Sequence, residues 1–349
     1  MKLSLSFSLR KKTSEKKNKR KKPSGKKTKM NDIFIEKYRP KSFEEVKGQE
    51  NIVRTVKAFV DKRNLPHMMF AGPAGVGKTS LILVVARTLF GENWRQNFLD
   101  LNASDDRGID VVRDTIKNFA KTKPMGDVPF KIIHLDECDS LTRDAQQALR
   151  RTMENFSSST RFCLSCNYSS KIIDPIVSRC AIFRFQALKR EDLVNILHNI
   201  ADKENLEVNE EILHLIADAG EGDVRRAENI IQSCSALSSK ITKDLVLQVS
   251  KPFHMEKVKE VLDNALKGSF LNAKERVMNL MLYDGFSALD IIKTMQKVIW
   301  ELEVSDREKL NIIEKTAEIE FRIVEGGDEF IQIEALLASI TKPSLVEKS

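Results

Sequence analysis

The stretch Gly72-Pro73-Ala74-Gly75-Val76-Gly77-Lys78-Thr79 matches the pattern G-x-x-x-x-G-K-[ST] at every defined position. It follows a short apolar run, His67–Ala71, that is typical of a buried strand, and it opens Lys78–Phe90, which has the spacing of a helix. Glycines let successive backbone N–H groups surround phosphate oxygens, and the positive end of the following helix faces the anion. The stretch therefore predicts a loop whose eight residues hold the phosphates of a nucleotide.

A second apolar run, Lys131–Asp136, ends in two adjacent acids, Asp136 and Glu137. We predict that Asp136 and Thr79 bind Mg²⁺ and that Lys78 contacts the β- and γ-phosphates. Because adjacent residues of a strand point to opposite faces, Glu137 must have a different task, and we expect it to orient and activate the attacking water. Together the two motifs predict ATP and Mg²⁺ as cofactors and ATP hydrolysis as the reaction.

Strand and helix patterns alternate from about residue 47 to residue 185, which predicts an α/β domain with a parallel sheet covered by helices on both faces. The expected strands are His67–Ala71, Asn97–Asn102, Lys131–Asp136, Arg161–Asn167 and Ala181–Phe185, and the expected helices between them include Lys78–Phe90, Gly108–Lys121 and Asp144–Asn155. Farther along the chain we find only helical spacing, with a break at Pro252. We therefore expect an α/β domain at 31–187, a small helical domain at 188–252 and a larger all-helical domain at 253–342.

The charge is concentrated at the start of the chain. Residues 1–30 contain 13 Lys and Arg against one acid, whereas the rest of the chain contains 45 basic and 49 acidic residues. Such a segment repels itself and has little to bury, so we expect residues 1–30, like residues 343–349, to form a tail without fixed structure. It is either a non-specific nucleic-acid arm or import signal, or simply a solvated extension. We find neither a secretory signal nor an apolar run that could span a bilayer, and the five scattered cysteines do not suggest disulfides.

Two further features have an ordinary explanation. Cys163 and Cys166 have the spacing of a metal or redox pair, but they fall in an expected buried strand, so we interpret them as small core residues. His134 lies in the strand that carries the acids, and we interpret it as a packed core residue rather than a catalyst.

Several short motifs narrow the family. They are Glu36-Lys37-Tyr38-Arg39-Pro40, Asn102–Gly108, Ala145–Glu154, Ser165-Cys166-Asn167, Ser178-Arg179-Cys180 and Gly222-Asp223-Val224-Arg225-Arg226. With the phosphate loop and the acidic box, they resemble AAA+ ATPases, and more narrowly the small subunits of replication factor C, in particular the archaeal form. The resemblance extends from about residue 33 to residue 340. Cys138 stands in the acidic box where alanine is usual, a difference that removes neither acid.

The resemblance implies roles for individual residues. Asn167 is expected to sense the γ-phosphate, Arg225 to reach the phosphates from a helical lid, and Tyr38 and Arg39 to border the nucleotide. Arg179 is expected to enter the ATP site of the neighbouring subunit, where it would stabilise charge on the γ-phosphate. The alternatives are a surface arginine for Arg225 and a helix-end arginine in a salt bridge for Arg179.

For DNA, the resemblance suggests helices that follow the duplex backbone through contacts to phosphates. Arg107 and Arg113 are the candidates, with an exposed cap of the helix as the alternative for each. The residues 253–342 would be a collar that holds the oligomer together.

The chain is therefore expected to be a clamp-loader subunit that uses ATP binding and hydrolysis to open and load a ring-shaped sliding clamp onto primed DNA. The implied partners are other small subunits and a large subunit, in a heteropentamer, together with the clamp and primer–template DNA. Its location would be the cytoplasm, with the nucleoid, or the nucleus in a eukaryote. Two alternatives stay open: a non-hydrolysing scaffold subunit of such a complex, or another AAA+ motor that remodels DNA or protein.

Overall fold

The computed structural model describes residues 33–104, 109–250 and 254–341. The expected tails, Arg107 and the break at Pro252 lie outside these residues, and so does the side chain of Arg113. The strands are β1 Met68–Ala71, β2 Phe98–Asn102, β3 Lys131–Asp136, β4 Thr160–Cys166 and β5 Ala181–Arg184. All five agree with the sequence prediction to within one residue at each end.

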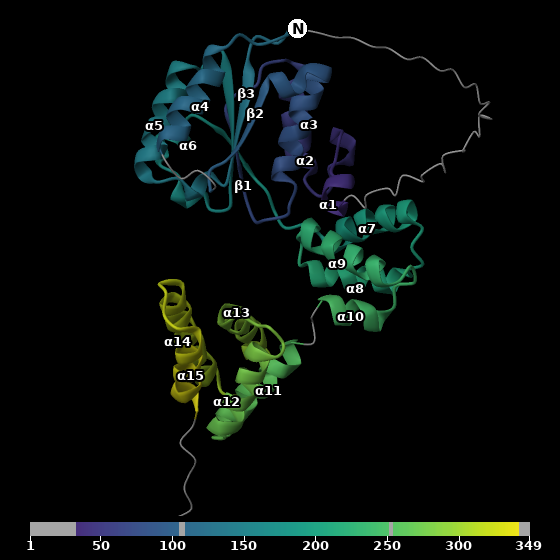
Figure 1. Cartoon of the computed structure of the whole chain (residues 1–349), viewed down its shortest axis with the longest axis vertical. Coiled ribbons are helices and arrows are strands. Elements are labelled where there is room, and N and C mark those ends of the chain that lie inside the picture. Colours follow the sequence, from purple (N-terminus) through teal and green to yellow (C-terminus); the bar gives the residue numbers. More distant parts are fainter. Residues whose placement is uncertain (1–32, 105–108, 251–253, 342–349) are drawn as a thin grey trace, which may run out of the picture.

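Besides loops and short 3-10 helices, the rest of the described chain forms α-helices (Figure 1). Around the sheet they are α1 Phe34–Lys37, α2 Glu50–Asp61, α3 Lys78–Phe90, α4 Ile109–Lys121, α5 Arg143–Asn155 and α6 Asp174–Val177. The next group is α7 Arg190–Glu204, α8 Glu210–Gly220, α9 Val224–Leu237 and α10 Lys243–Ser250. The last group is α11 His254–Leu266, α12 Phe270–Leu282, α13 Ala288–Val298, α14 Asp306–Val324 and α15 Glu329–Ile340. None of the described helices is both long and apolar enough to cross a membrane.

The five strands form one parallel sheet in the order β2-β3-β4-β1-β5. Successive residues of each strand enter different cores because their side chains alternate between the faces. Met69 packs in a core with α4, α5 and α6, whereas its neighbours Met68 and Phe70 pack in a core with α2, α3 and the helices α7–α10. Figure 1 shows these two layers of helices on opposite sides of the sheet. The predicted α/β fold is confirmed, and it brings the carboxyl ends of β1, β3 and β4 to one edge, where ligands bind in open α/β sheets.

A chain of polar side chains crosses the middle of this sheet. His134 of β3 lies between Asp100 of β2 and Ser165 of β4, with Nδ1 2.7 Å from Asp100 Oδ1 and Nε2 3.0 Å from Ser165 Oγ. Since a carboxylate can only accept, Nδ1–H donates to Asp100 and Nε2 accepts the Ser165 hydroxyl proton. The order of groups is that of a hydrolase triad, but Ser165 and His134 are completely buried. The array therefore stabilises the sheet, and His134 is the packed core residue that the sequence indicated. Cys163 and Cys166 are buried in β4 as predicted.

The helices after β5 form two separate groups. Helices α7–α10 contribute to the same core as Met68, Phe70, α2 and α3. Helices α11–α15 enclose a separate core. In Figure 1 the second group lies apart from the sheet, at the far end of α7–α10. An ion pair between Lys297 of α13 and Glu221, which follows α8, links the two groups.

The buried polar chain allows a double-mutant test. Ser165→Ala leaves His134 Nε2 buried without a partner, so we expect it to destabilise the sheet by about 1–3 kcal/mol. His134→Leu in the same background removes the group that lacks a partner, so the double variant should lose less than the sum of the two single variants. Urea unfolding of the four proteins gives the coupling energy. Strict additivity would show that the two side chains are energetically independent.

Candidate nucleotide-binding site

The phosphate loop begins where β1 ends, beside the end of β4. The Gly72 N–H donates to the Cys166 carbonyl oxygen over 3.2 Å, which places the first residue of the loop next to Asn167. At Gly72 the backbone has φ 153°, and a Cβ atom would lie 2.5 Å from the Phe185 carbonyl oxygen. Glycine is therefore required at this position for two reasons: its backbone conformation, and its close contact with the backbone of Phe185, which follows β5.

Lys78 is the first residue of α3, and its side chain folds back over the loop. Its ammonium donates to the carbonyl oxygens of Gly72 and Pro73, the second over 2.6 Å, and to Asn167 Oδ1 over 3.0 Å. Burial lowers the pKa of Lys78 below its usual value, while the nearby Asp136 carboxylate acts in the opposite direction. The sequence-predicted lysine and the predicted sensor Asn167 are thus in direct contact, and the positive charge lies where an anionic ligand would lie on the loop.

Thr79 and Asp136, the two predicted metal ligands, come together. The Thr79 hydroxyl donates to Asp136 Oδ2 over 2.8 Å across the gap between α3 and β3. A hydroxyl and a carboxylate at this separation present the hard oxygen donors that Mg²⁺ prefers. The residues present therefore fit the metal that the sequence predicts.

The sequence argument about Glu137 is wrong in one respect. Strand β3 ends at Asp136, and Glu137 lies in the left-handed region with φ 51°, so strand alternation does not set its direction. The turn sets it instead, and Glu137 lines the same pocket as Asp136, Lys78 and Asn167. Non-glycine residues in this region are uncommon and cluster at functional sites, which fits a catalytic carboxylate at this point.

Asp139, the last acid of the box, has a role that the sequence did not reveal. Its Oδ2 accepts the backbone N–H groups of Asn167 and Tyr168 over 3.3 and 3.1 Å. Asp139 therefore fixes the loop that carries Asn167 relative to the acids Asp136 and Glu137. Cys138, between them, is buried and hydrogen-bonded to Cys166, and it faces away from the pocket-lining acids into the sheet core.

We expect Asp139→Ala to lower the rate of ATP hydrolysis by about 10–100-fold, because a small displacement of a group that positions the reactants carries a large rate penalty. Asp139→Asn retains an oxygen acceptor and should lose less. Nucleotide affinity should stay close to wild type, since Asp139 does not line the pocket. Single-turnover hydrolysis and equilibrium binding separate the two effects, and an equal loss in both would contradict a positioning role.

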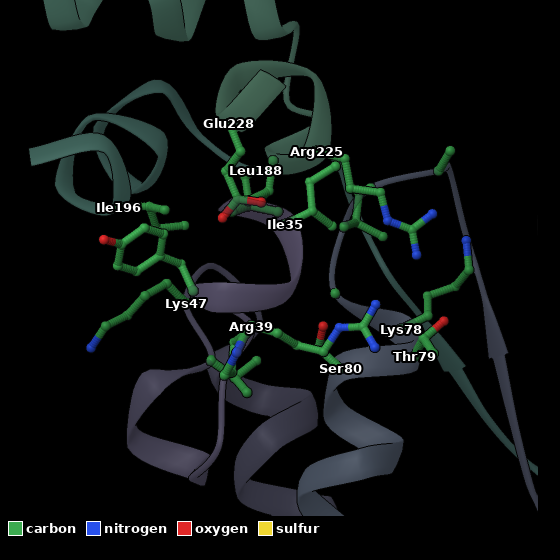
Figure 2. A pocket seen from close by; sticks show the side chains of 18 of the residues that line it. Ile35, Arg39, Lys47, Lys78, Thr79, Ser80, Leu188, Ile196, Arg225 and Glu228 are labelled. Atoms are coloured by element: carbon green, nitrogen blue, oxygen red, sulfur yellow. The ribbon is translucent and has the colours of Figure 1, made fainter. Parts of the chain in front are cut away.

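Helix α9 closes over the phosphate loop. The Val224 N–H, in its first turn, donates to the Gly75 carbonyl oxygen over 3.0 Å, and Asp223 caps the helix by accepting the Arg226 N–H. A Cβ on Gly75 would lie 1.6 Å from Asp223 Oδ1, so glycine is required for this contact. Arg225 then lines the pocket from the α9 side (Figure 2). The structure thus places the predicted lid arginine within the same pocket as Lys78.

The N-terminal segment forms another wall. Tyr38 and Arg39, the residues expected to border the nucleotide, both line the pocket. The Tyr38 hydroxyl donates to Glu204 at the end of α7, and the Phe34 N–H donates to Gln232 of α9. These contacts attach the segment to the same group of helices that carries Arg225.

The end of the pocket away from Lys78 and Thr79 combines apolar walls with two charged side chains. Its lining includes Ile35, Val46, Leu188 and Ile196, together with Lys47 and Glu228, the last on α9 (Figure 2). Glu228 is 5% exposed, and burial raises its pKa to about 7, an effect that Arg225 and Arg39 reduce and that Asp223 and Glu36 increase. The sequence analysis missed it, although a glutamate next to Ala227 on the core-facing side of α9 is an unusual residue for that position.

The raised pKa predicts a pH-dependent stability. Between the ordinary value of 4.5 and about 7, the folded chain holds a proton that the unfolded chain has lost. Stability therefore falls as the pH rises through this range. We expect Glu228→Gln, which cannot ionise, to gain up to about 3 kcal/mol over wild type between about pH 5 and pH 8. Thermal unfolding without nucleotide at both pH values measures this, with exposed Glu191→Gln as control. A gain that is the same at both pH values would refute it.

Comparison with known proteins agrees with this geometry. The family models that match are the ATPase family associated with various cellular activities (AAA) at residues 68–188, an RCF1/5-like AAA+ ATPase lid domain at 195–236 and the replication factor C C-terminal domain at 253–339. The chain is 48% identical over 311 residues to the replication factor C small subunit of Methanococcus maripaludis strain S2, covering 89% of this chain and 99% of the relative. The chain belongs to the replication factor C small subunit family.

Other relatives agree. The replication factor C small subunits of Archaeoglobus fulgidus and Staphylothermus marinus are 45% and 48% identical, and the alignments cover 89% and 88% of this chain and 97% and 94% of the relatives. Among solved structures, the RuvB Holliday junction branch migration motor of Thermotoga maritima matches with a TM-score of 0.53 and 19% identity, over 74% of this chain and 85% of that chain. At that identity the match shows the AAA+ fold alone.

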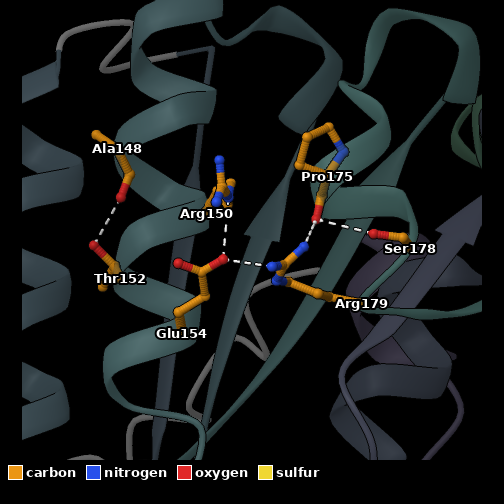
Figure 3. Close-up of polar contacts among 7 residues, drawn as sticks. All are labelled: Ala148, Arg150, Thr152, Glu154, Pro175, Ser178 and Arg179. Atoms are coloured by element: carbon orange, nitrogen blue, oxygen red, sulfur yellow. Dashed lines mark hydrogen bonds and ion pairs between the residues drawn. The ribbon is translucent and has the colours of Figure 1, made fainter.

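Arg179 lies outside the chain's own candidate nucleotide pocket. Its guanidinium pairs with Glu154 of α5 and donates to the Pro175 carbonyl oxygen over 2.6 Å, while Arg150 pairs with the same Glu154 carboxylate over 3.0 Å (Figure 3). Both sequence interpretations of Arg179 are therefore compatible with the structure, since an arginine in a salt bridge can still face a neighbour. Its side chain is 36% exposed, so it is accessible from outside.

Proposed function

We propose that this chain is the ATP-hydrolysing subunit of a clamp loader, which uses ATP binding and hydrolysis to open and load a ring-shaped sliding clamp onto primed DNA. The observation that carries the proposal is that the predicted phosphate-binding, acidic, sensor and lid residues line one pocket: Lys78, Thr79, Asp136, Glu137, Asn167 and Arg225. Membership of a replication factor C small subunit family supports AAA+ ATPase activity, and the intact acids argue against a scaffold that has lost hydrolysis.

In this proposal the loop from Gly72 to Thr79 binds the phosphates through its backbone N–H groups, and Lys78 moves from its carbonyl partners to the β- and γ-phosphates. Thr79 and Asp136 hold Mg²⁺, which supplies charge neutralisation at the phosphates. Glu137 orients the attacking water and accepts its proton. Asn167, whose backbone is held by Asp139, contacts the γ-phosphate through its side-chain amide.

The lid couples the nucleotide to the shape of the subunit. Arg225 reaches the phosphates from the first turn of α9, and the contact between Val224 and Gly75 joins that helix to the loop. Closure of the lid on ATP would then move α7–α10 as a group, and the ion pair between Lys297 and Glu221 would carry the movement to α11–α15. Bound ATP thereby determines how neighbouring subunits meet.

Arg179 completes the site of the adjacent subunit. Its exposure and its position outside this chain's own pocket support a role in trans, where an arginine is worth several powers of ten in rate. Glu154 and Arg150 keep its guanidinium extended at the surface until a neighbour's γ-phosphate competes for it. A lone subunit would therefore be a poor ATPase.

Helices α11–α15 form the collar through which subunits associate. Large apolar side chains are exposed within residues 254–341, among them Tyr283, Trp300 and Phe321 at 82%, 65% and 67%. Burial of these side chains against a neighbouring subunit would stabilise the oligomer. The expected partners are other small subunits and a large subunit in a heteropentamer, with the clamp and primer–template DNA, the latter contacted through Arg107 and Arg113. The location would be wherever that DNA lies, the cytoplasm or the nucleus.

The experiment that tests the proposal is steady-state ATP hydrolysis by the purified full chain, alone and assembled with a large subunit. We expect primed DNA to stimulate turnover, and a ring-shaped clamp to increase it further. Lys78→Ala should abolish turnover by removing the phosphate contact, and Arg179→Ala should abolish it while leaving nucleotide binding intact. A rate of ATP hydrolysis that neither DNA nor clamp changes would refute clamp loading and favour another AAA+ motor.

Mixing the Lys78→Ala and Arg179→Ala chains tests the arginine in trans. A mixed oligomer contains some interfaces where an intact Lys78 faces an intact Arg179, so part of the turnover should return. The mixed assembly is verified by mass before the assay. No recovery in a verified mixed oligomer would contradict the role of Arg179.

A further inference from the structure

Glu228 lies where a structural role for a carboxylate is hard to find. It belongs to α9, one turn after Arg225, and its side chain points from that helix into the pocket (Figure 2). It is 5% exposed, and no hydrogen bond to its carboxyl is present among the residues that the structure describes. A buried carboxyl is costly unless something pairs with it, so its place on a pocket wall points to a ligand group.

The position of Glu228 within the pocket indicates which part of a nucleotide its carboxyl would contact. Lys78, Thr79 and Asp136 occupy one end, and they fix the phosphates there. Ile35, Leu188 and Ile196 surround the other end together with Glu228. A flat, largely apolar heterocycle fits such walls, and a nucleotide with its phosphates on the loop extends its base in this direction.

The chemistry of adenine then matches the chemistry of a carboxyl group. Its exocyclic amino group is a donor that lies beside ring nitrogens that accept, whereas guanine presents an oxygen acceptor at that position. A carboxyl oxygen accepts from the amino group, and a protonated carboxyl also donates to the neighbouring ring nitrogen. We propose that Glu228 is a specificity-determining residue that recognises the 6-amino group of adenine. This inference rests on the proposed function of the pocket as an ATP site.

The surroundings of Glu228 favour the form that suits adenine. Burial raises its pKa to about 7, so a large share of the carboxyl is protonated at neutral pH. The charged groups that act on it are Arg225 and Arg39, which favour ionisation, and Asp223 and Glu36, which oppose it. A neutral carboxylic acid that donates a hydrogen bond in an apolar pocket is a known arrangement in enzymes. Guanine has a ring N–H next to its exocyclic amino group, and these two donors would instead pair with an ionised carboxylate.

A purely structural Glu228 makes a different prediction. Its loss would alter the packing of α9 against α1 and would weaken every nucleotide to the same extent. A role in recognition of the 6-amino group would weaken ATP more than a nucleotide that lacks this group. Purine riboside triphosphate, which lacks that group, and GTP, which carries an oxygen there, separate the two.

The experiment is equilibrium binding of the Mg²⁺ complexes of ATP, GTP and purine riboside triphosphate to the full chain at about pH 7. We expect wild type to bind ATP about tenfold more tightly than purine riboside triphosphate, since one hydrogen bond at a buried group is worth about that much. Glu228→Met should weaken ATP more than purine riboside triphosphate, which keeps the ring nitrogen but lacks the amino donor, so the roughly tenfold preference for ATP should disappear. Glu228→Gln, which keeps an oxygen acceptor, should keep most of the preference for ATP. Glu191→Met, an exposed change on the same group of helices, is the matched control.

The outcomes separate the inference from the function beneath it. Binding of none of the three nucleotides by folded wild type would refute the ATP site and with it the inference. Binding of ATP without preference over purine riboside triphosphate would refute the inference alone. An equal loss of all three nucleotides in Glu228→Met would assign Glu228 a structural role. GTP bound as tightly as ATP by wild type would also overturn the proposal.

Discussion

The buried ammonium of Lys78 is the interaction on which the rest of the site depends. A positive charge at this depth needs partners, and the carbonyl oxygens of Gly72 and Pro73 and the amide oxygen of Asn167 supply them. These partners come from the end of β1, the loop itself and the end of β4, so one side chain ties three segments together. In the proposed function, a phosphate that takes the ammonium away from Asn167 frees that amide to contact the phosphate, while Asp139 still holds its backbone in place. The presence of nucleotide would then change the hydrogen bonding of Asn167 without moving its loop.

The same loop is also the place where the lid is attached. Gly75 accepts a hydrogen bond from the first turn of α9, and its lack of a side chain leaves room for the Asp223 carboxylate. That helix carries Arg225 and Glu228 one turn apart, the first toward the phosphates and the second toward the far end of the pocket. One element thus lines both ends of the pocket. In the proposed function, movement of α9 would change the phosphate contact and the contact at the base together.

Much of the fold could be predicted from sequence because its signals are local. The phosphate loop, the apolar strand runs and the helical spacing each depend on neighbouring residues, so the parallel α/β sheet and the two helical groups were predicted, with strand ends within one residue. The residues in the pocket were found where a motif carried them. Glu137 shows the limit of the strand rule, since its left-handed backbone ends the strand one residue earlier than the argument assumed. Asp139 and Glu228 were missed because their importance comes from residues distant in sequence that only the folded chain brings near.

Arg179 illustrates the remaining gap in a different way. A salt bridge to Glu154 and a role in the neighbouring subunit looked like competing explanations in the sequence, yet the exposed pair in the structure is compatible with both, and the proposed function treats them as successive states of one side chain. The Glu154 carboxylate is shared with Arg150, so the loss of Arg179 to a neighbour's phosphate leaves the acid paired rather than isolated. Because the pair is partly exposed, holding the arginine costs little and releasing it costs little. An arginine held in this way is ordered before the neighbour arrives, and only its final contact waits for assembly.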